Sequence, residues 1–347
     1  MEDGKFANER PGNDVRHFRA FPQLLLEGGV ACGRQTLLTG LVEAGARRFR
    51  SGFCHEISIR LEPDGMTEVG FEGAIPLAAE LERLTRNESE GLDFMQFALF
   101  RTVAFSSEAK LSFPDERRGR LVVLRFRDGE FVSSETEAAP RKSVLALRYM
   151  PDEKIMGNGG CDLKRLRADL RRIAGLNAGL TLTLDKYEYY FSPGGAAELL
   201  MEFFPITWPD EIFSWRGETL EFAIARPRDG KPGELRSFAG DRETVDGGLH
   251  VDGFKRGMTD ALNFGRKKTV PTEKILREWN VVIAAHVDDP IFESGYICRL
   301  GGDPGLEPLF WFLTNVMITR HMKRDPDFFE RGLGKGKTLW KAKTPKP

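Results

Sequence analysis

The chain has 347 residues, of which 41% are apolar and 30% charged, and its net charge is −1 at pH 7. This length predicts two domains, because single cores stop growing at roughly 250 to 300 residues. The balanced charge argues against a strongly basic nucleic-acid coat, and no apolar run approaches the ~20 residues of a membrane span. Cysteine and histidine are too few and too scattered for a disulfide scaffold or a metal site. Without a signal peptide, we expect a cytoplasmic protein that makes no membrane contact.

The first half of the chain mixes helical and strand patterns in an order typical of α/β sandwiches. After a polar N-terminal arm over residues 1–20, apolar residues recur at helical spacing over 37–49, and alternation over 56–61 predicts a strand. Further strands are predicted at residues 110–113, 120–127 and 143–149. Met150-Pro151 is the predicted domain boundary, because proline disfavours helical conformation in the residue before it.

The second half begins with an amphipathic helix over residues 162–174, whose outer face carries arginines. Strands are predicted at residues 181–184, 188–191, 212–215, 219–226, 234–238 and 280–286, and helices at 253–264 and 307–323. We therefore predict an arm over 1–20, a first domain over 21–150 and a second over 151–330. Residues 331–347 carry six basic residues and no acidic one, which predicts a flexible basic tail.

Four short blocks, taken in chain order, resemble one protein family. They are Gly52–Ile57, read GFCHEI; Leu170–Leu180, read LRRIAGLNAGL; Thr244–Phe254, read TVDGGLHVDGF; and residues 289–301, with the frame D-P-x-F-E followed by R-L-G. The matching family comprises the gyrase B and topoisomerase IV B proteins, whose transducer domain carries the third block as T-x-[DE]-G-G-T-H-x-x-G-F. The resemblance implies an α+β protein. A Bergerat (GHKL-type) α/β sandwich would be followed by a ribosomal-protein-like transducer domain with a left-handed βαβ unit.

In the same sequence register, the residues differ on the helix with which this family hydrolyses ATP. The family reads E-V-V-D-N there, with the glutamate as general base and the asparagine as magnesium ligand. This chain reads Gly40-Leu41-Val42-Glu43-Ala44. Glycine cannot take a proton and alanine cannot ligate a metal. Glu43 is either a displaced base or, as is commoner, a solvated glutamate on the helix face.

Other elements implied by the resemblance have changed as well. The motif D-x-G-x-G-I-P, which reads adenine, corresponds to Gly70–Pro76, and the glycine-rich phosphate lid corresponds to the bulky segment Leu92–Phe97. Ser143 replaces a glycine-threonine contact, and Ile297 replaces the lysine that senses the terminal phosphate. The degenerate ATP-site positions are therefore Gly40, Glu43, Ala44, Gly70, Gly73, Ala74, Ser143 and Ile297.

Basic residues are candidate contacts for DNA phosphates. The candidates are Arg171, Arg172, Arg266, Lys267, Lys268, Lys335, Lys337 and Lys341. A solvated helix face explains the two arginines equally well. The phenylalanines of residues 94–105 are expected in the core, where they could fill the vacated nucleotide pocket. His250 is expected to pack beside the Gly247-Gly248 turn.

We therefore expect a pseudo-ATPase that binds neither ATP nor magnesium, has no catalytic residues, and serves as a scaffold or regulator. Its expected partners are DNA or a topoisomerase subunit. One alternative is a divergent ATP-dependent type II topoisomerase of the gyrase B kind that uses Glu43 or Glu72, and another is a decoy that inhibits a cellular gyrase. In the family, a tyrosine of the N-terminal arm touches the nucleotide, whereas the first tyrosine here is Tyr149. Any homodimer is therefore not expected to depend on nucleotide.

Overall fold

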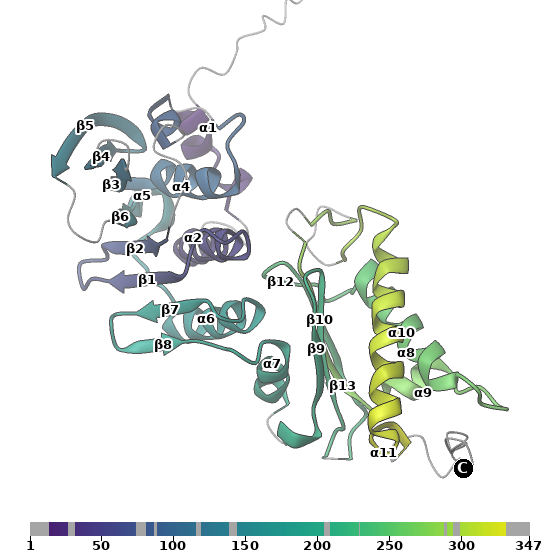
Figure 1. The fold of residues 1–347 in the computed structure, drawn as a ribbon. Helices are drawn as coiled ribbons and strands as arrows, with labels where there is room; N and C mark the ends of the chain where they lie inside the picture. The colour runs from purple at the N-terminus through teal and green to yellow at the C-terminus, as the bar shows by residue number, and fades with distance from the viewer. Residues whose placement is uncertain are drawn as a thin grey trace, which may run out of the picture. The chain divides into compact units, whose positions relative to one another are not determined.

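The structure is a computed structural model that describes residues 14–26, 32–73, 81–86, 89–115, 119–138, 144–204, 209–228, 230–287, 290–293 and 299–330. It divides into two compact units, Met1–Ser192 and Pro193–Pro347 (Figure 1). The sequence analysis set the boundary at Met150-Pro151. The first unit continues to Ser192 because a strand after that boundary pairs with the sheet of the first unit. Residues 331–347, the predicted tail, lie outside the described residues.

An eight-stranded sheet forms the centre of the first unit, in the order β5-β4-β3-β6-β2-β1-β7-β8. Its strands are β1 (Glu56–Leu61), β2 (Thr67–Glu72), β3 (Ser106–Asp115), β4 (Arg120–Arg127), β5 (Glu130–Ala138), β6 (Leu145–Pro151), β7 (Thr181–Leu184) and β8 (Glu188–Tyr190). All neighbours are antiparallel except β1 and β7. The sequence analysis predicted β1 and β4 at their observed bounds but missed β2.

Three helices lie along one face of this sheet, α4 (Phe94–Ala104), α2 (Gly33–Arg50) and α6 (Leu163–Leu176) (Figure 1). Helix α2 is the central one and contacts both of the others. It approaches the strands closely at Gly45, where a Cβ would lie 2.5 Å from Ile57 Cδ1 and 2.8 Å from Phe71 Cδ1. The predicted helices over 37–49 and 162–174 are thus confirmed. Both pack against the sheet by their apolar faces.

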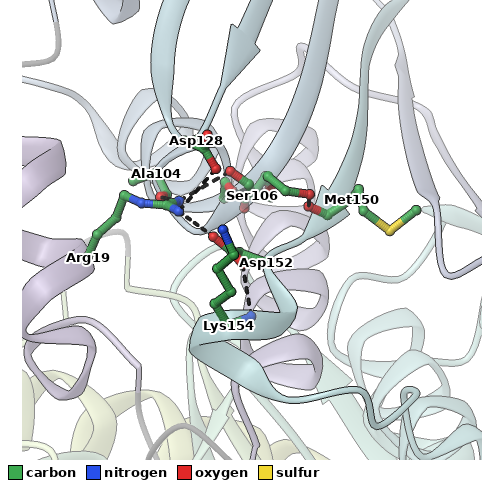
Figure 2. A network of polar contacts seen from close by, with 9 residues as sticks. Arg19, Ala104, Ser106, Asp128, Met150, Asp152 and Lys154 are labelled. Atoms are coloured by element: carbon green, nitrogen blue, oxygen red, sulfur yellow. Dashed lines mark hydrogen bonds and ion pairs between the residues drawn. The ribbon is translucent and has the colours of Figure 1, made fainter.

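Part of the predicted polar arm is a helix, α1 (Asp14–Ala20), held on the C-terminal end of α4. Val15 is buried in the core, and Arg19 donates from Nη1 to the carbonyl oxygens of Ala104 at 2.8 Å and Ser106 at 3.2 Å. Arg19 also pairs with Asp152, which caps the short helix α5 (Glu153–Met156) (Figure 2). These contacts satisfy carbonyls that a helix end leaves without partners. They hold α1 and the start of α5 against the C-terminal end of α4.

The second unit contains a five-stranded sheet in the order β12-β11-β13-β10-β9. Its strands are β9 (Phe213–Arg216), β10 (Leu220–Ala225), β11 (Leu235–Ala239), β12 (Arg242–Glu243) and β13 (Asn280–Ala285), and its helices are α7 (Ala196–Phe203), α8 (Leu249–Asn263), α9 (Thr272–Leu276), α10 (Leu306–Arg324) and α11 (Pro326–Glu330). Strands β11 and β13 are parallel and joined through α8, so they form a βαβ unit. Short 3₁₀ turns complete the described chain at Pro22–Leu24, Glu82–Arg86 and Pro209–Glu211.

Helices α8 and α10 run side by side at close range in the second unit (Figure 1). A Cβ on Gly253 would lie 2.4 Å from the carbonyl oxygen of Glu307, and one on Gly257 would lie 2.5 Å from that of Trp311. Glycine therefore lets the two backbones touch. Among the helices in the described ranges, none combines the length and apolarity that a bilayer span requires.

Candidate functional site

The candidate site is the packing around α2, which presents a different set of side chains to each neighbour. Gly45 faces the sheet, and Gly40 faces α4. Gln35 contacts Asp169 of α6. Almost every residue from Leu37 to Ala46 is buried. The helix that the resemblance assigns to ATP chemistry therefore has little exposed surface.

Arg101 of α4 fills the space above Gly40. A Cβ on Gly40 would lie 1.9 Å from Arg101 Nη2, a distance that real structures do not allow. Arg101 is only 8% exposed, and Nη2 donates to the carbonyl oxygen of Thr36 at 3.5 Å. A Cβ at position 40 would therefore have to displace the end of the Arg101 side chain, for which glycine leaves room. The guanidinium occupies the space where the side chain of a glutamate at position 40 would begin.

The sequence analysis did not identify Arg101, and it offered phenylalanines as the filling of this space. Phe100 and Phe105 are indeed buried, as expected for the core. Phe100 makes an edge contact with Phe18 of α1, with ring centroids 6.2 Å apart. Phe94 is 40% exposed. The group against Gly40 is a cation, and a buried arginine within an otherwise apolar helical pattern was the signal that could have indicated it.

Ala44, one turn after Gly40, lines a small cavity of 190 Å³. The other lining residues are Arg47, Arg48 and Ser51 of α2 and Asp93, Phe94 and Met95 at the start of α4. Asp93 pairs with Arg48 and also caps α4 by accepting from the Gln96 amide at 2.8 Å. Ligand pockets typically measure about 300 to 1,000 Å³. This cavity is too small for a nucleotide, and Ala44 offers no ligand to a metal.

Gly70 and Phe71 lie on opposite faces of strand β2. Gly70 pairs with Ser58 of β1, and its Cβ would lie 2.7 Å from Ser58 Oγ, on the side away from α2. Phe71 faces α2, is fully buried, and packs where Gly45 leaves room. A residue that reads a base held beside α2 must face α2. Phe71, which the sequence analysis did not name, is therefore the β2 side chain nearest to that position.

The turn after β2 depends on Gly73, whose φ of +135° favours glycine. A Cβ there would also lie 2.6 Å from the carbonyl oxygen of Phe53. Three other degenerate positions lie outside the described residues: Ala74, Ser143 and Ile297.

Glu43 is not a solvated glutamate, which corrects the commoner interpretation of this residue. It is 7% exposed, and its Oε1 lies 3.7 Å from Arg172 Nη2 on α6. Arg172 also pairs with Asp169 at 3.2 Å. Burial of the carboxylate is offset by this cation and by the polar side chains beside it. Glu43 thus joins α2 to α6, away from α4.

The candidate DNA contacts are scattered over both units. Arg172 is half-buried and paired, whereas Arg171 is exposed and lies 6.0 Å from the ring centroid of Tyr190. Arg266 donates from Nε to the carbonyl oxygen of Leu262 at 2.6 Å and so closes the end of α8. Lys267 and Lys268 are exposed. The remaining candidates, Lys335, Lys337 and Lys341, lie outside the described residues.

Two of the blocks that carry the family resemblance meet in the second unit. The amide of Leu249 donates to the carbonyl oxygen of Leu300 at 2.9 Å, and the amide of Leu300 donates to that of Gly247 at 2.9 Å. A Cβ on Gly248 would lie 2.3 Å from the oxygen of Leu300. Arg299 adds an ion pair of 2.7 Å with Asp252. The signature therefore builds a packed turn.

His250 is the second residue of α8, directly after that turn, and it is fully buried. Its Nε2 lies 3.3 Å from the hydroxyl of Thr244, which in turn lies 2.7 Å from the hydroxyl of Ser237. Burial lowers the pKa of His250 to about 3, so the imidazole is neutral at pH 7. The structural role expected for His250 agrees with this burial.

Comparison with known proteins shows which proteins the chain is similar to. No protein-family model matches the chain. It is 27% identical over 362 residues to the chloroplastic and mitochondrial gyrase B protein of Nicotiana benthamiana, covering 89% of this chain and 49% of that protein. It is 25% identical over 281 residues to the topoisomerase IV B protein of Borreliella burgdorferi, covering 78% of this chain and 46% of that one. The chain is a relative of gyrase B and topoisomerase IV B. It spans about half the length of the curated relatives it matches.

Solved structures of gyrase B share the fold of this relative. The 43K ATPase domain of Thermus thermophilus gyrase B, solved with an aminocoumarin, gives a TM-score of 0.76 at 21% identity and covers 92% of both chains. The gyrase B protein of Myxococcus xanthus gives 0.76 at 19% identity, covering 90% of this chain and 97% of that one. The fold of this gyrase B relative is thus the α+β, GHKL-type fold that the sequence predicted. Over the part of the chain that is described, no group of three or more acidic, histidine or cysteine residues could hold a metal ion.

Proposed function

We propose that this gyrase B relative is a pseudo-ATPase that keeps the fold of the ATPase region as a scaffold or regulator. Its partners would be DNA or a topoisomerase subunit. The observation that carries the proposal is the guanidinium of Arg101, which packs directly on Gly40. ATP hydrolysis needs a base and a magnesium ligand one turn apart on α2. Gly40 and Ala44, which occupy these two positions, supply neither group.

The space around α2 supports the same proposal. Arg101 closes the side of Gly40, and Phe71 fills the sheet side. The 190 Å³ beside Ala44 would have to grow severalfold to admit a nucleotide. Such growth would separate α4 from α2, although Arg19 and the Asp93 cap hold α4 at its two ends. Loss of the buried contacts between the helices would oppose it.

A divergent ATP-dependent topoisomerase subunit remains the contrasting function, with Glu43 as the displaced base. The burial of Glu43 and its contact with Arg172 weigh against that role, because a base must reach a water molecule beside the phosphate. We expect Glu43→Gln to change the stability of the α2 and α6 packing and to leave ATP turnover at background.

The test is a measurement of ATP turnover by the purified chain, with and without magnesium. We expect no magnesium-dependent turnover above that of a buffer blank. The blocking variant is Ala44→Arg, which places a long side chain in the cavity next to α4. Magnesium-dependent turnover that Ala44→Arg or Glu43→Gln abolishes would overturn the proposal. Turnover that persists in both variants but is lost in Glu72→Ala would overturn it equally. Only turnover that persists in all three variants would come from a contaminating ATPase.

A further inference from the structure

A second cavity lies in the second unit, far along the chain from α2. It has a volume of 830 Å³, within the usual range for ligand sites. Its walls come from the loop after β10 and from α9 with the residues around it. The lining residues are Arg226, Pro227, Gly230, Lys231, Pro232, Pro271, Glu273, Lys274, Arg277 and Glu278.

The walls of this cavity are fixed by backbone contacts. The amide of Gly233 donates to the carbonyl oxygen of Arg277 at 2.7 Å, and the amide of Glu234 donates to the side chain of Asn280 at 3.1 Å. A Cβ on Gly233 would lie 2.1 Å from the carbonyl oxygen of Trp279, so only glycine permits this approach. The loop that forms one wall is therefore tied to the end of α9.

One of the lining cations is also held in place. The guanidinium of Arg226 lies 4.9 Å from the ring centroid of Trp279 and donates to the carbonyl oxygen of Phe328 at 2.9 Å. Stacking on an aromatic face and a hydrogen bond restrict the rotamers of an arginine. Arg226 thus places a fixed positive charge at the edge of the cavity.

Among the described residues, four cations and two carboxylates line the cavity. Lys274 and Arg277 are exposed, and neither forms an ion pair or a side-chain hydrogen bond with any other described residue. The same is true of the carboxylates of Glu273 and Glu278. Both kinds of group are therefore available to a ligand. Cations favour phosphate oxygens, whereas carboxylates accept hydrogen bonds from hydroxyl or amino groups.

We propose that this cavity binds a phosphorylated ligand, with the phosphate on Lys274 and Arg277 and with hydroxyl or amino groups on Glu273 and Glu278. Phosphate alone would leave two carboxylates near its negative charge, so a ligand that carries both kinds of group fits better. A free nucleotide has this chemistry, and so has a nucleotide within a nucleic-acid strand. The site is separate from α2 and does not depend on the loss of ATP hydrolysis.

The test is calorimetric titration of the full chain with ADP, with adenosine and with a single-stranded oligonucleotide, all without magnesium. The variant is the double substitution Lys274→Ala and Arg277→Ala. The matched control is Arg120→Ala with Lys154→Ala, which removes the same charge from two exposed positions of the first unit. Tryptophan fluorescence checks that each variant is folded, because Trp279 lies beneath Arg226.

We expect ADP to bind the wild-type chain and the control equally, and to bind the Lys274 and Arg277 variant at least tenfold more weakly. Adenosine should bind weakly to all three. Oligonucleotide binding that is tighter than ADP binding and is lost in the same variant would identify a nucleic-acid strand as the source of the phosphate. The proposal is overturned if neither ADP nor the oligonucleotide binds at millimolar concentration. It is overturned equally if adenosine matches ADP or if the control loses as much affinity as the variant.

Discussion

At the scale of single residues, the signature turn shows how a motif can be recognised before its chemistry is known. The block from Thr244 to Phe254 predicted a family and a packed His250. It did not predict the hydroxyls of Ser237 and Thr244 that lie in line with the ring. Ser237 lies on strand β11, whereas His250 lies on helix α8. The sequence pattern alone does not tell which strand residues face a given helix residue. The structure supplies that pairing and with it a pH dependence.

Because His250 stays neutral in the folded chain down to about pH 3, folding opposes its protonation. Below pH 6.5 the unfolded chain takes up a proton that the folded chain does not, so the free energy of unfolding falls as the pH falls. In His250→Asn this contribution is absent. We expect the stability advantage of the wild type over His250→Asn to shrink by about 2 kcal/mol between pH 7.5 and pH 5.

Denaturant unfolding followed by tryptophan fluorescence measures this difference. All five tryptophans lie in the second unit, at Trp208, Trp215, Trp279, Trp311 and Trp340. The pKa of His321 is also lowered by burial, but that residue is present in both proteins and its effect cancels. A stability difference that stays constant from pH 7.5 to pH 5 would show that His250 does not carry the pH dependence.

At the scale of elements, the sequence predicted helices better than contacts. The apolar spacing of α2, α6 and α10 is repeated over several turns, so their existence was readable. Strand β2 was missed although Thr67, Val69 and Phe71 alternate inward, because the strand is short and contains Gly70, a residue type that is depleted in strands. The parallel pairing of β7 with β1 was not readable either. Such pairing joins distant segments and leaves no local pattern.

The candidate site was predicted only in part, because the sequence shows local patterns but not the contacts between distant segments. The family register placed Gly40 and Ala44 on one helix, and both lie on α2 toward α4. The apolar pattern of α4 marks Arg101 as unusual, but it does not tell on which helix the guanidinium packs, since a contact across two helices is not encoded by the spacing within either one. The register also assigned Gly70 to adenine recognition without the pleat, which puts Phe71 toward α2.

The contact between α2 and α4 predicts a coupling between Gly40 and Arg101. At an open helix position, Gly→Ala stabilises by about 1 kcal/mol. At Gly40 the added Cβ would overlap Arg101 Nη2, and overpacking of this kind costs roughly 1 to 3 kcal/mol. We expect Gly40→Ala to destabilise the wild type and to stabilise the Arg101→Ala background.

Thermal unfolding followed by circular dichroism, with hydrogen exchange of α2 and α4, measures both single variants and the double variant. The interaction free energy from this cycle isolates the pair. Tryptophan fluorescence serves as the control, because the second unit should unfold alike in all four proteins. Equal stabilisation by Gly40→Ala in both backgrounds would mean that Arg101 does not pack on Gly40 in solution.

At the scale of the whole molecule, the two units have separate consequences for ligands. In the first unit, the described residues around Ala44 line a cavity of 190 Å³, which is below the usual size of a ligand site. In the second, a larger cavity presents Lys274 and Arg277, which have no ion pair among the described residues. A nucleotide that binds the second unit would therefore do so without engaging α2. A ligand can shift the equilibrium between monomer and dimer only if it binds these two states with different affinities.

This separation predicts that a non-hydrolysable ATP analogue will not change the oligomeric state. Tyr149 is buried within its own unit at 1% exposure and so is not placed to clasp a nucleotide in a partner. Light scattering should give the same molar mass with and without the analogue and magnesium. The double variant Lys274→Ala and Arg277→Ala serves as the control, since it removes binding at the second cavity. A shift from monomer to dimer that occurs in both proteins would show that a nucleotide reaches α2, and the packing of Arg101 on Gly40 would then have to open in solution.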